Sequence, residues 1–345
     1  MKAVQLYSHG GIERLRYVDT EVPTLASPSD AIVKLKAAAL NHRDLLIRRG
    51  ATEAQVALPR ILGSDGAGTV VAIGDQVKDL RLGDNVCLYP SRACGECDFC
   101  ATNREFMCLR TRLLGERENG TYAEYITVPG RNCLPIPTGL SFEEAAAFPL
   151  AFTNAWRMLI SNAEIKPGES VLILGIGGGV AIAALQLATH LGAHVIVTSG
   201  SDEKLATALS YGAQHGVNHQ EADFAKEVRS FTNKRGVDVV VDNIGGECWA
   251  KSLASLVKGG RLVSCGAIGG AQPPTDLRRI FWNHLKVFGS TVGSRAEFRQ
   301  VLNFMAVTQT KPIIDRVFPL KEAAQAQQRM EQGKQFGKIV LRVDA

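Results

Sequence analysis

The sequence predicts an α/β protein of two domains, one mostly β and the other doubly wound around a parallel sheet. Up to about residue 151 the chain consists of short strand-like segments separated by glycine-rich turns. From residue 152 strand-like and helix-like segments alternate, and alternation of this kind makes neighbouring strands parallel. A length of 345 residues is enough for two separate hydrophobic cores.

The mostly β domain is expected to be a small antiparallel barrel or sandwich. Its clearest strand-like segments are residues 31–37, 68–74 and 86–88, the last of which follows a Gly83-Asp84 turn. The last fifty or so residues mix helix and strand again. We therefore expect residues 1–151 and 291–345 to form this domain and residues 152–290 to form the other.

The doubly wound domain shows a regular order of elements. Its predicted strands and helices cover residues 171–174, 180–191, 194–198, 202–211, 237–241, 248–257 and 261–265. The apolar stretch 171–188 is interrupted by glycines at 175 and 177–179, which argues against a membrane helix. Because the N-terminus lacks a secretory signal pattern, we expect a soluble, cytoplasmic protein.

Composition and charge narrow the function classes. Hydrophobic residues make up 46% and charged residues 21%, which is ordinary for a globular protein. The net charge of +5 is spread along the chain without a run of five basic residues, so nucleic-acid binding has no support.

A glycine-rich turn joins the strand 171–174 to the helix that follows it. Gly175 permits a tight turn, Gly177 lets the backbone approach a pyrophosphate, and Gly179 or Ala181 supplies the third small residue. The helix N-terminus then presents free N–H groups to the phosphates. This arrangement predicts a dinucleotide site.

The end of the next strand indicates which nicotinamide dinucleotide binds. Ser199-Gly200-Ser201 stands where an enzyme specific for NAD has an acidic residue. Hydroxyl groups and Lys204 suit a ribose phosphate, whereas Asp202 counts against one unless it only caps a helix. These residues favour NADP(H) over NAD(H).

Four of the eight cysteines lie within fifteen residues, with the spacing C-x2-C-x2-C-x7-C: Cys94, Cys97, Cys100 and Cys108. Four thiolates from one loop can bind a zinc ion tetrahedrally and leave it no open position, which predicts a structural site. An iron–sulfur cluster is the rival interpretation, and two disulfides in so short a loop would be strained.

Together these features resemble the medium-chain dehydrogenase/reductase superfamily, which includes zinc alcohol dehydrogenases and quinone oxidoreductases. The resemblance also rests on Gly63-Ser64-Asp65-Gly66-Ala67-Gly68 and Gly120-Thr121-Tyr122-Ala123-Glu124-Tyr125, and it covers nearly the whole chain. It implies a GroES-like catalytic domain and a Rossmann domain, with the active site in the cleft between them. The cysteine lobe is typical of the zinc alcohol dehydrogenase branch.

The positions of the catalytic zinc ligands depart from that branch. Asn41, Ser64 and Leu150 stand where the zinc enzymes have cysteine, histidine and cysteine. These side chains cannot supply the usual ligands, and a set drawn from His42, Asp44 and Asp65 is a minority alternative. We therefore predict an enzyme that lacks a catalytic zinc ion.

Without a Lewis acid, reduction of an activated acceptor is easier than oxidation of a plain alcohol. A quinone or an α,β-unsaturated carbonyl needs only positioning and hydrogen bonds to the developing negative charge. Asn41 is the expected donor, and His42 or Arg43 can assist it. Asp44 and Asp65 either orient these groups or make structural hydrogen bonds.

The predicted partners are NADP(H), one structural zinc ion, a small carbonyl, enone or quinone substrate, and a second or further copy of the chain in a homodimer or homotetramer. An alcohol or aldehyde dehydrogenase and a non-catalytic NADP(H)-binding sensor or scaffold remain alternatives. The resemblance places the nicotinamide near Leu150. The predicted cofactor contacts are Thr153, Asn154, Gly175, Gly177, Gly178, Gly179, Val180, Ser199, Gly200, Ser201, Lys204, Asn243, Gly266, Ala267, Ile268 and Lys338.

Overall fold

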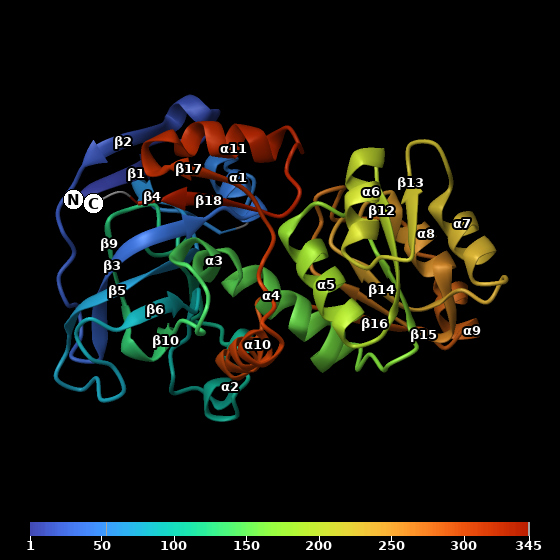
Figure 1. Ribbon diagram of the computed structural model, residues 1–345, viewed down its shortest axis with the longest axis horizontal. Helices are drawn as coiled ribbons and strands as arrows, with labels where there is room; N and C mark the ends of the chain where they lie inside the picture. The colour runs from blue at the N-terminus through green and yellow to red at the C-terminus, as the bar shows by residue number, and fades with distance from the viewer. Residues whose placement is uncertain (53, 344–345) are drawn as a thin grey trace. The chain divides into compact units, whose positions relative to one another are not determined.

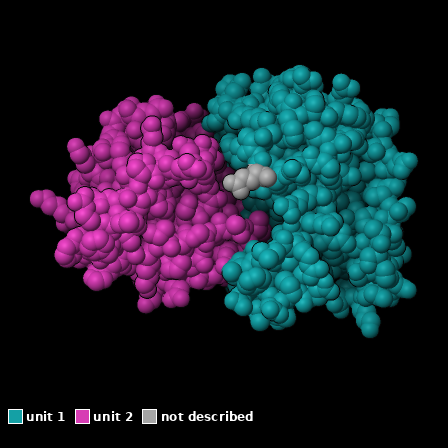
Figure 2. All heavy atoms as spheres, turned by 180° about the vertical axis from the view of Figure 1, so that it is seen from behind, with its two compact units in different colours: residues 1–150, 294–345 teal, residues 151–293 magenta. Residues whose placement is uncertain are grey.

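The computed structural model describes residues 1–52 and 54–343. The chain divides into two compact units, which Figure 2 shows in different colours. Unit 1 comprises residues 1–150 and 294–345, and unit 2 comprises residues 151–293. These limits differ by one to three residues from the boundaries expected from the sequence.

Unit 1 is built around a seven-stranded sheet in the order β10-β6-β5-β3-β18-β17, with β9 also paired to β3. All its pairs are antiparallel except β17 with β18. The strands are β3 (Asp30–Ala39), β5 (Asp65–Ile73), β6 (Asn85–Leu88), β9 (Tyr125–Pro129), β10 (Cys133–Pro135), β17 (Ile314–Pro319) and β18 (Lys338–Arg342).

Smaller elements complete unit 1 around this sheet (Figure 1). Two further sheets contain β1 (Lys2–Leu6), β2 (Leu15–Asp19) and β4 (Arg60–Ile61), and β7 (Ser91–Arg92) and β8 (Arg112–Leu113). The helices are α1 (His42–Arg49), α2 (Asp98–Ala101), α3 (Phe142–Ala147), α10 (Arg295–Thr308) and α11 (Ala323–Glu331). The 3-10 turns are η1 (Ile12–Arg14), η2 (Glu105–Met107), η3 (Gly130–Asn132) and η5 (Leu320–Glu322).

The core of unit 1 explains why β3 is its central strand. Most residues of β3 are buried, and its alanines 37–39 leave room for α3 to pack across the sheet. Helix α3 in turn buries Ala145, Ala146 and Ala147, and a capping box of Ser141 and Glu144 begins it. The predicted GroES-like, mostly β domain is confirmed.

Unit 2 is a Rossmann-type domain. Its six strands lie in the order β13-β12-β11-β14-β15-β16, and every neighbouring pair is parallel. They are β11 (Ser170–Ile173), β12 (His194–Ser199), β13 (His215–Asn218), β14 (Val237–Asp242), β15 (Leu256–Ser264) and β16 (Lys286–Gly289). The predicted parallel sheet is therefore confirmed.

Helices cover both sides of this sheet, with α5 on one side and α8 on the other (Figure 1). They are α5 (Gly179–His190), α6 (Asp202–Ser210), α7 (Phe224–Phe231), α8 (Cys248–Ser255) and α9 (Leu277–Trp282). Helix α4 (Pro149–Trp156) contains the limit between the units and runs into a π-helical segment, η4 (Arg157–Asn162).

The strand order of unit 2 reverses between β11 and β14. The chain leaves β11 toward β12 and β13, and then returns to β14 on the other side of β11. The carboxyl ends of the strands at such a reversal form the crevice in which open α/β sheets bind ligands. Among the described residues, no helix has the length and apolarity needed to cross a membrane.

Candidate functional site

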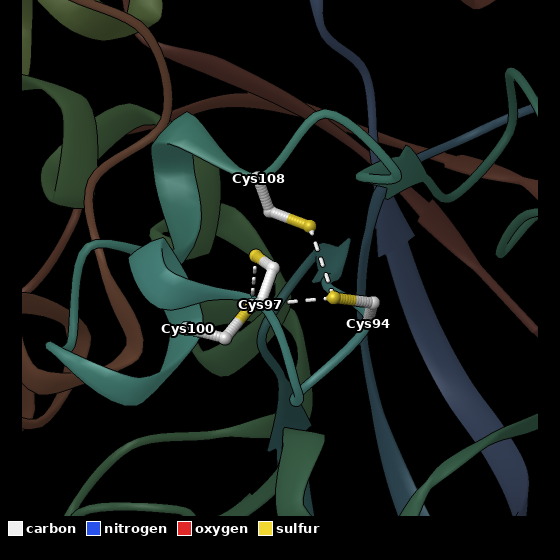
Figure 3. A group of neighbouring side chains, drawn as sticks. All are labelled: Cys94, Cys97, Cys100 and Cys108. Carbon is white, nitrogen blue, oxygen red and sulfur yellow. Dashed lines mark hydrogen bonds between the residues drawn. The ribbon is translucent and has the colours of Figure 1, made fainter.

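The four clustered cysteines converge in unit 1, where their side chains point toward a common centre (Figure 3). Cys97 caps the N-terminus of α2, and Cys108 follows the η2 turn. The Sγ atoms lie 3.7 Å apart for Cys94–Cys100 and 3.5 Å apart for both Cys97–Cys100 and Cys94–Cys108.

These separations fit a single zinc ion. Four sulfur atoms about 2.3 Å from one tetrahedral ion are separated by about 3.8 Å. In a 4Fe–4S cluster each thiolate binds a different iron atom, which holds the cysteine sulfurs further apart. Backbone N–H groups of Glu96 and Cys97 lower the pKa of the Cys94 thiol, which favours the thiolate that a metal ion binds. The loop could therefore hold a structural zinc ion.

A second polar cluster forms where three strands of unit 1 meet. Strand β3 lies between β5 and β18. Its last residue, Ala39, pairs with Asp65 of β5 on one side and with Val340 of β18 on the other. The chain then passes through Asn41, which caps helix α1. This topology brings Asn41, Ser64, Asp65 and Lys338 together, although Lys338 is 297 residues from Asn41 along the chain.

Hydrogen bonds join these four residues into one buried network. The Lys338 ammonium donates to Asn41 Oδ1 at 2.7 Å and to Asp65 Oδ2 at 2.9 Å. The Asn41 amide nitrogen donates to Ser64 Oγ at 3.0 Å and to Asp65 Oδ2 at 2.9 Å. Because an ammonium only donates and a carboxylate only accepts, these two partners fix the orientation of the amide.

The Asp65 carboxylate is held from two sides. Its Oδ2 accepts from Asn41 and Lys338, while its Oδ1 accepts from the Leu150 N–H at 2.9 Å. The Asp65 side chain is fully buried and that of Lys338 is 5% exposed, so the two opposite charges compensate each other inside the protein. A cation thus occupies the neighbourhood of Asn41, Ser64 and Leu150.

As far as the structure describes the chain, the Ser64 hydroxyl has a free hydrogen to donate, whereas the Asn41 amide has none. Both N–H groups of Asn41 are engaged with Ser64 and Asp65, so Asn41 does not have the free N–H that the sequence-based hypothesis requires. The Ser64 hydroxyl accepts from Asn41, and among the described residues nothing accepts its hydrogen. Gly63 makes this position possible, since its φ is +92° and a Cβ would lie 2.4 Å from the Tyr122 ring.

Asp44 supports the cluster from behind. Its Oδ2 accepts from the Asn41 backbone N–H at 2.9 Å and from the Tyr122 hydroxyl at 2.8 Å. Burial raises the pKa of Asp44 to about 6. His42, the first residue of α1, has a pKa lowered by burial and by the Arg49 charge, and Arg43 forms an ion pair with Glu116.

The alternative metal ligands His42, Asp44 and Asp65 do not converge. Within the described part of the chain, the four cysteines are the only group of three or more His, Cys, Asp and Glu side chains close enough together to hold a metal ion. The structure therefore does not bring His42, Asp44 and Asp65 together around one point.

The glycine turn of unit 2 lies at the reversal of the strand order, after β11. Gly175 and Gly177 have φ values of +64° and +116°, a region of backbone conformation that favours glycine. Gly178 caps α5 without a side chain, and a Cβ there would meet nothing closer than 3.8 Å. Asn243, which follows β14, has a buried Oδ1 atom without a partner. The glycine turn fits a pyrophosphate next to a helix N-terminus, whereas the Asn243 oxygen can only accept a hydrogen bond.

The residues that we expect to bind a ribose phosphate begin at the end of β12. Ser199 Oγ accepts from the Ser201 N–H at 3.1 Å, and Ser201 Oγ caps α6. Asp202 Oδ1 accepts from Asn218 at 2.9 Å, which gives Asp202 a structural partner. Gly200 lies so close to Gln220 that a Cβ would be 2.8 Å from its Nε2.

The remaining predicted nicotinamide contacts also belong to unit 2. Thr153 is fully buried in α4, and Asn154 accepts from the Ser290 hydroxyl at 3.3 Å. Gly266 and Ala267 follow β15, and the neighbouring Ile268 side chain is exposed. These assignments stay predictions. Lys338, by contrast, lies in unit 1, where two of its three ammonium N–H groups donate hydrogen bonds to Asn41 and Asp65.

Comparison with known proteins supports both units. Residues 27–138 match the family described as alcohol dehydrogenase GroES-like domain, and residues 179–307 match that described as zinc-binding dehydrogenase. The chain is 34% identical to a zinc-type alcohol dehydrogenase-like protein of Schizosaccharomyces pombe, over 97% of this chain and 96% of that protein.

Two further relatives represent different reactions. A human quinone oxidoreductase is 27% identical over 99% of this chain and 97% of its own length. The crystal structure of an NAD-dependent alcohol dehydrogenase is 39% identical, with a TM-score of 0.95 over 100% of both chains.

Proposed function

This chain belongs to the medium-chain dehydrogenase/reductase superfamily and is an oxidoreductase, and on that premise we propose that it uses NADPH to reduce a quinone or an α,β-unsaturated carbonyl without a catalytic metal ion. The observation that carries this proposal is the buried network of Asn41, Ser64, Asp65 and Lys338. It contains a fixed positive charge and a free hydroxyl donor where zinc enzymes of the family have metal ligands.

The chemistry of the network suits an acceptor that becomes negatively charged. NADPH supplies the hydride. The Ser64 hydroxyl is oriented by the Asn41 amide, so its hydrogen is available to the acceptor oxygen on which negative charge develops. The Lys338 ammonium is held by Asp65 and Asn41, and its charge and third N–H favour the same oxyanion. An unactivated alcohol lacks this advantage, because no group here replaces a Lewis acid.

We place NADPH on unit 2, with its pyrophosphate at Gly175–Gly179 and its ribose phosphate at Ser199, Ser201 and Lys204. The absence of an acidic side chain at position 199 and the pairing of Asp202 with Asn218 support NADPH over NADH. Two relatives are named NAD-dependent alcohol dehydrogenases, and that cofactor preference is a property of those two proteins.

We assign one structural zinc ion to Cys94, Cys97, Cys100 and Cys108. Three of the six sulfur separations are 3.5–3.7 Å, and all four sulfur atoms lie within 4.8 Å of one another, which supports this assignment. A chain with two zinc ions would instead support the alternative function, an alcohol dehydrogenase, which the names of several relatives favour.

We also propose self-association through unit 2, as a homodimer or homotetramer. Strand β16 is an edge strand, and exposed apolar side chains cluster in sequence around it and α9: Leu277, Phe281, Trp282 and Val287. Light scattering of the purified protein at several concentrations tests this, and a monomer at all of them contradicts it.

The function is tested by the oxidation of NADPH in the presence of quinones and enones, with primary alcohols and NADP⁺ as the opposing panel. Ser64→Ala should lower kcat on the best acceptor about a hundredfold, which is the usual cost of one lost oxyanion donor. The affinity for NADPH, measured by fluorescence titration, should not change. Asn41→Ala should also lower kcat, because it releases the Ser64 hydroxyl and the Lys338 ammonium.

An unchanged kcat for Ser64→Ala would overturn the role of this cluster. NADPH binding without turnover of any acceptor would favour the sensor or scaffold instead. Turnover of primary alcohols but not of quinones or enones would favour the alcohol dehydrogenase.

A further inference from the structure

Unit 1 contains a cavity of about 850 Å³ beside the cysteine loop. None of its lining residues belongs to the glycine turn or to the Asn41 network. Apart from Lys78, Asp79 and Glu118, the charged residues that line it are six arginines: Arg92, Arg110, Arg112, Arg131, Arg295 and Arg299.

Only half of these arginines have a carboxylate partner. Arg92 pairs with Asp30 and Glu118, Arg112 shares Glu118, and Arg110 pairs with Glu96. Among the described residues, no carboxylate forms an ion pair with Arg131, Arg295 or Arg299. The lining therefore carries more basic than acidic side chains; Arg131 and Arg299 are exposed, and Glu105 Oε1, which accepts from the Arg295 backbone N–H at 2.7 Å, is the carboxylate beside Arg295.

The unbalanced arginines are held close to one another. Burial and the nearby charges of Arg131 and Arg299 lower the pKa of the Arg295 guanidinium, while the Glu105 charge opposes that effect. The Nε atom of Arg295 is buried and has no hydrogen-bond partner. A buried donor without a partner, close to like charges, is a group that an anion would satisfy.

The helix that carries two of these arginines is fixed in place. Arg295 and Arg299 lie one turn apart at the start of α10, so they share a face of the helix. The ring of Phe298 lies 5.7 Å from that of Tyr89 and 5.8 Å from that of Phe148. A capping box of Ser294 and Glu297 satisfies the first turn. The guanidinium groups are thus presented by a rigid element.

We propose that this cavity binds a small molecule bearing two or more phosphate groups. One guanidinium group can bind two oxygens of a phosphate through two parallel N–H bonds. Several guanidinium groups around one cavity therefore favour a ligand with more than one phosphate group. The volume lies within the range of small-molecule sites, about 300–1,000 Å³. Such a ligand would bind unit 1 independently of the dinucleotide on unit 2.

The cysteine loop offers a competing explanation, because four thiolates around a zinc ion carry a net negative charge that arginines could offset. Cys94 lines the cavity, and the Nη1 atom of Arg131 lies 2.7 Å from the position that a Cβ on Gly95 would take. Arg299 pairs with no described residue of that loop. Replacing Arg299 therefore distinguishes a phosphate site from arginines that only offset the charge of the cysteine loop.

The test is calorimetric titration of the zinc-loaded, NADPH-saturated protein with inorganic pyrophosphate. NADPH blocks the glycine turn, and zinc is assayed before and after the titration. The proposal expects saturable binding that weakens with salt. It also expects Arg299→Gln to weaken binding at least tenfold, the double variant with Arg295→Gln to weaken it further, and the exposed control Arg16→Gln to leave it unchanged.

Absence of saturable binding to the wild-type protein overturns the proposal. Equal binding by wild type and Arg299→Gln overturns it too. If the arginine variants lose zinc and the wild type binds no pyrophosphate, the arginines serve the metal site alone.

Discussion

Replacing Lys338 with methionine removes the charge at the centre of the polar network while keeping a side chain of similar length. Lys338 donates to Asn41 Oδ1 at 2.7 Å and to Asp65 Oδ2 at 2.9 Å. The Asp65 side chain is fully buried. Lys338→Met therefore leaves a buried carboxylate with only the Asn41 amide and the Leu150 N–H as donors.

Breaking a buried ion pair by removing one partner typically costs about 3–5 kcal/mol. For a unit of this size, a loss of about 3 kcal/mol corresponds to a fall in Tm of roughly 6–12 °C. Much of that loss should return in Lys338→Met/Asp65→Asn, because no charge is then left uncompensated. The Asn41 amide can turn over in the double variant, so that its oxygen accepts from the introduced amide and from the Ser64 hydroxyl.

The assay is thermal and denaturant unfolding of the wild type, the single variant and the double variant. Lys334→Met is the matched control, because Lys334 is exposed and its loss should change the free energy of unfolding by less than about 0.5 kcal/mol. If Lys338→Met is as stable as the wild type, or if the double variant is no more stable than the single one, the reasoning about this network is wrong.

Three further variants test the metal loop, the cofactor preference and the buried acid. Cys97→Ser should lower the zinc content and Tm before it affects kcat, and a zinc-free wild type or an iron–sulfur absorption band would contradict the site. Ser199→Asp should narrow or reverse the preference for NADPH through repulsion of the ribose phosphate; equal or better NADH affinity in the wild type would contradict the assignment. Because the pKa of Asp44 rises from 3.8 to about 6 on folding, its ionisation lowers stability as pH rises from about 4 to about 6. Asp44→Asn keeps an oxygen for the Asn41 N–H and the Tyr122 hydroxyl, so it should be more stable than the wild type by up to about 3 kcal/mol at about pH 8, but not at about pH 4. Equal pH dependence of the two unfolding free energies would refute this.

The local parts of the molecule could be predicted from the sequence. The four cysteines lie within fifteen residues, so their spacing alone restricts them to one loop. The glycine turn joins a strand directly to its helix, and that order holds in β11 and α5. Element ends were less predictable. The helix expected to reach residue 257 ends at Ser255, because Leu256 already pairs with Val237 in the sheet.

The polar network could not be predicted in this way, since it depends on pairing between distant strands. The position of Lys338 next to Asn41 follows from the order β5-β3-β18, which local periodicity does not reveal. From the sequence, Lys338 was expected only as a cofactor contact. Likewise, the sequence identified Asn41 as a polar residue in place of a metal ligand, but not that its two N–H groups would be engaged by Ser64 and Asp65.

We propose that hydride transfer in this enzyme proceeds without a catalytic metal ion. The most direct test measures turnover of the best quinone or enone before and after treatment with a chelator, together with the zinc content of the same samples. We expect one zinc ion per chain, retained by the cysteine loop, and an unchanged kcat. Two zinc ions per chain, with kcat lost as the second is removed and restored when zinc is added back, would contradict it.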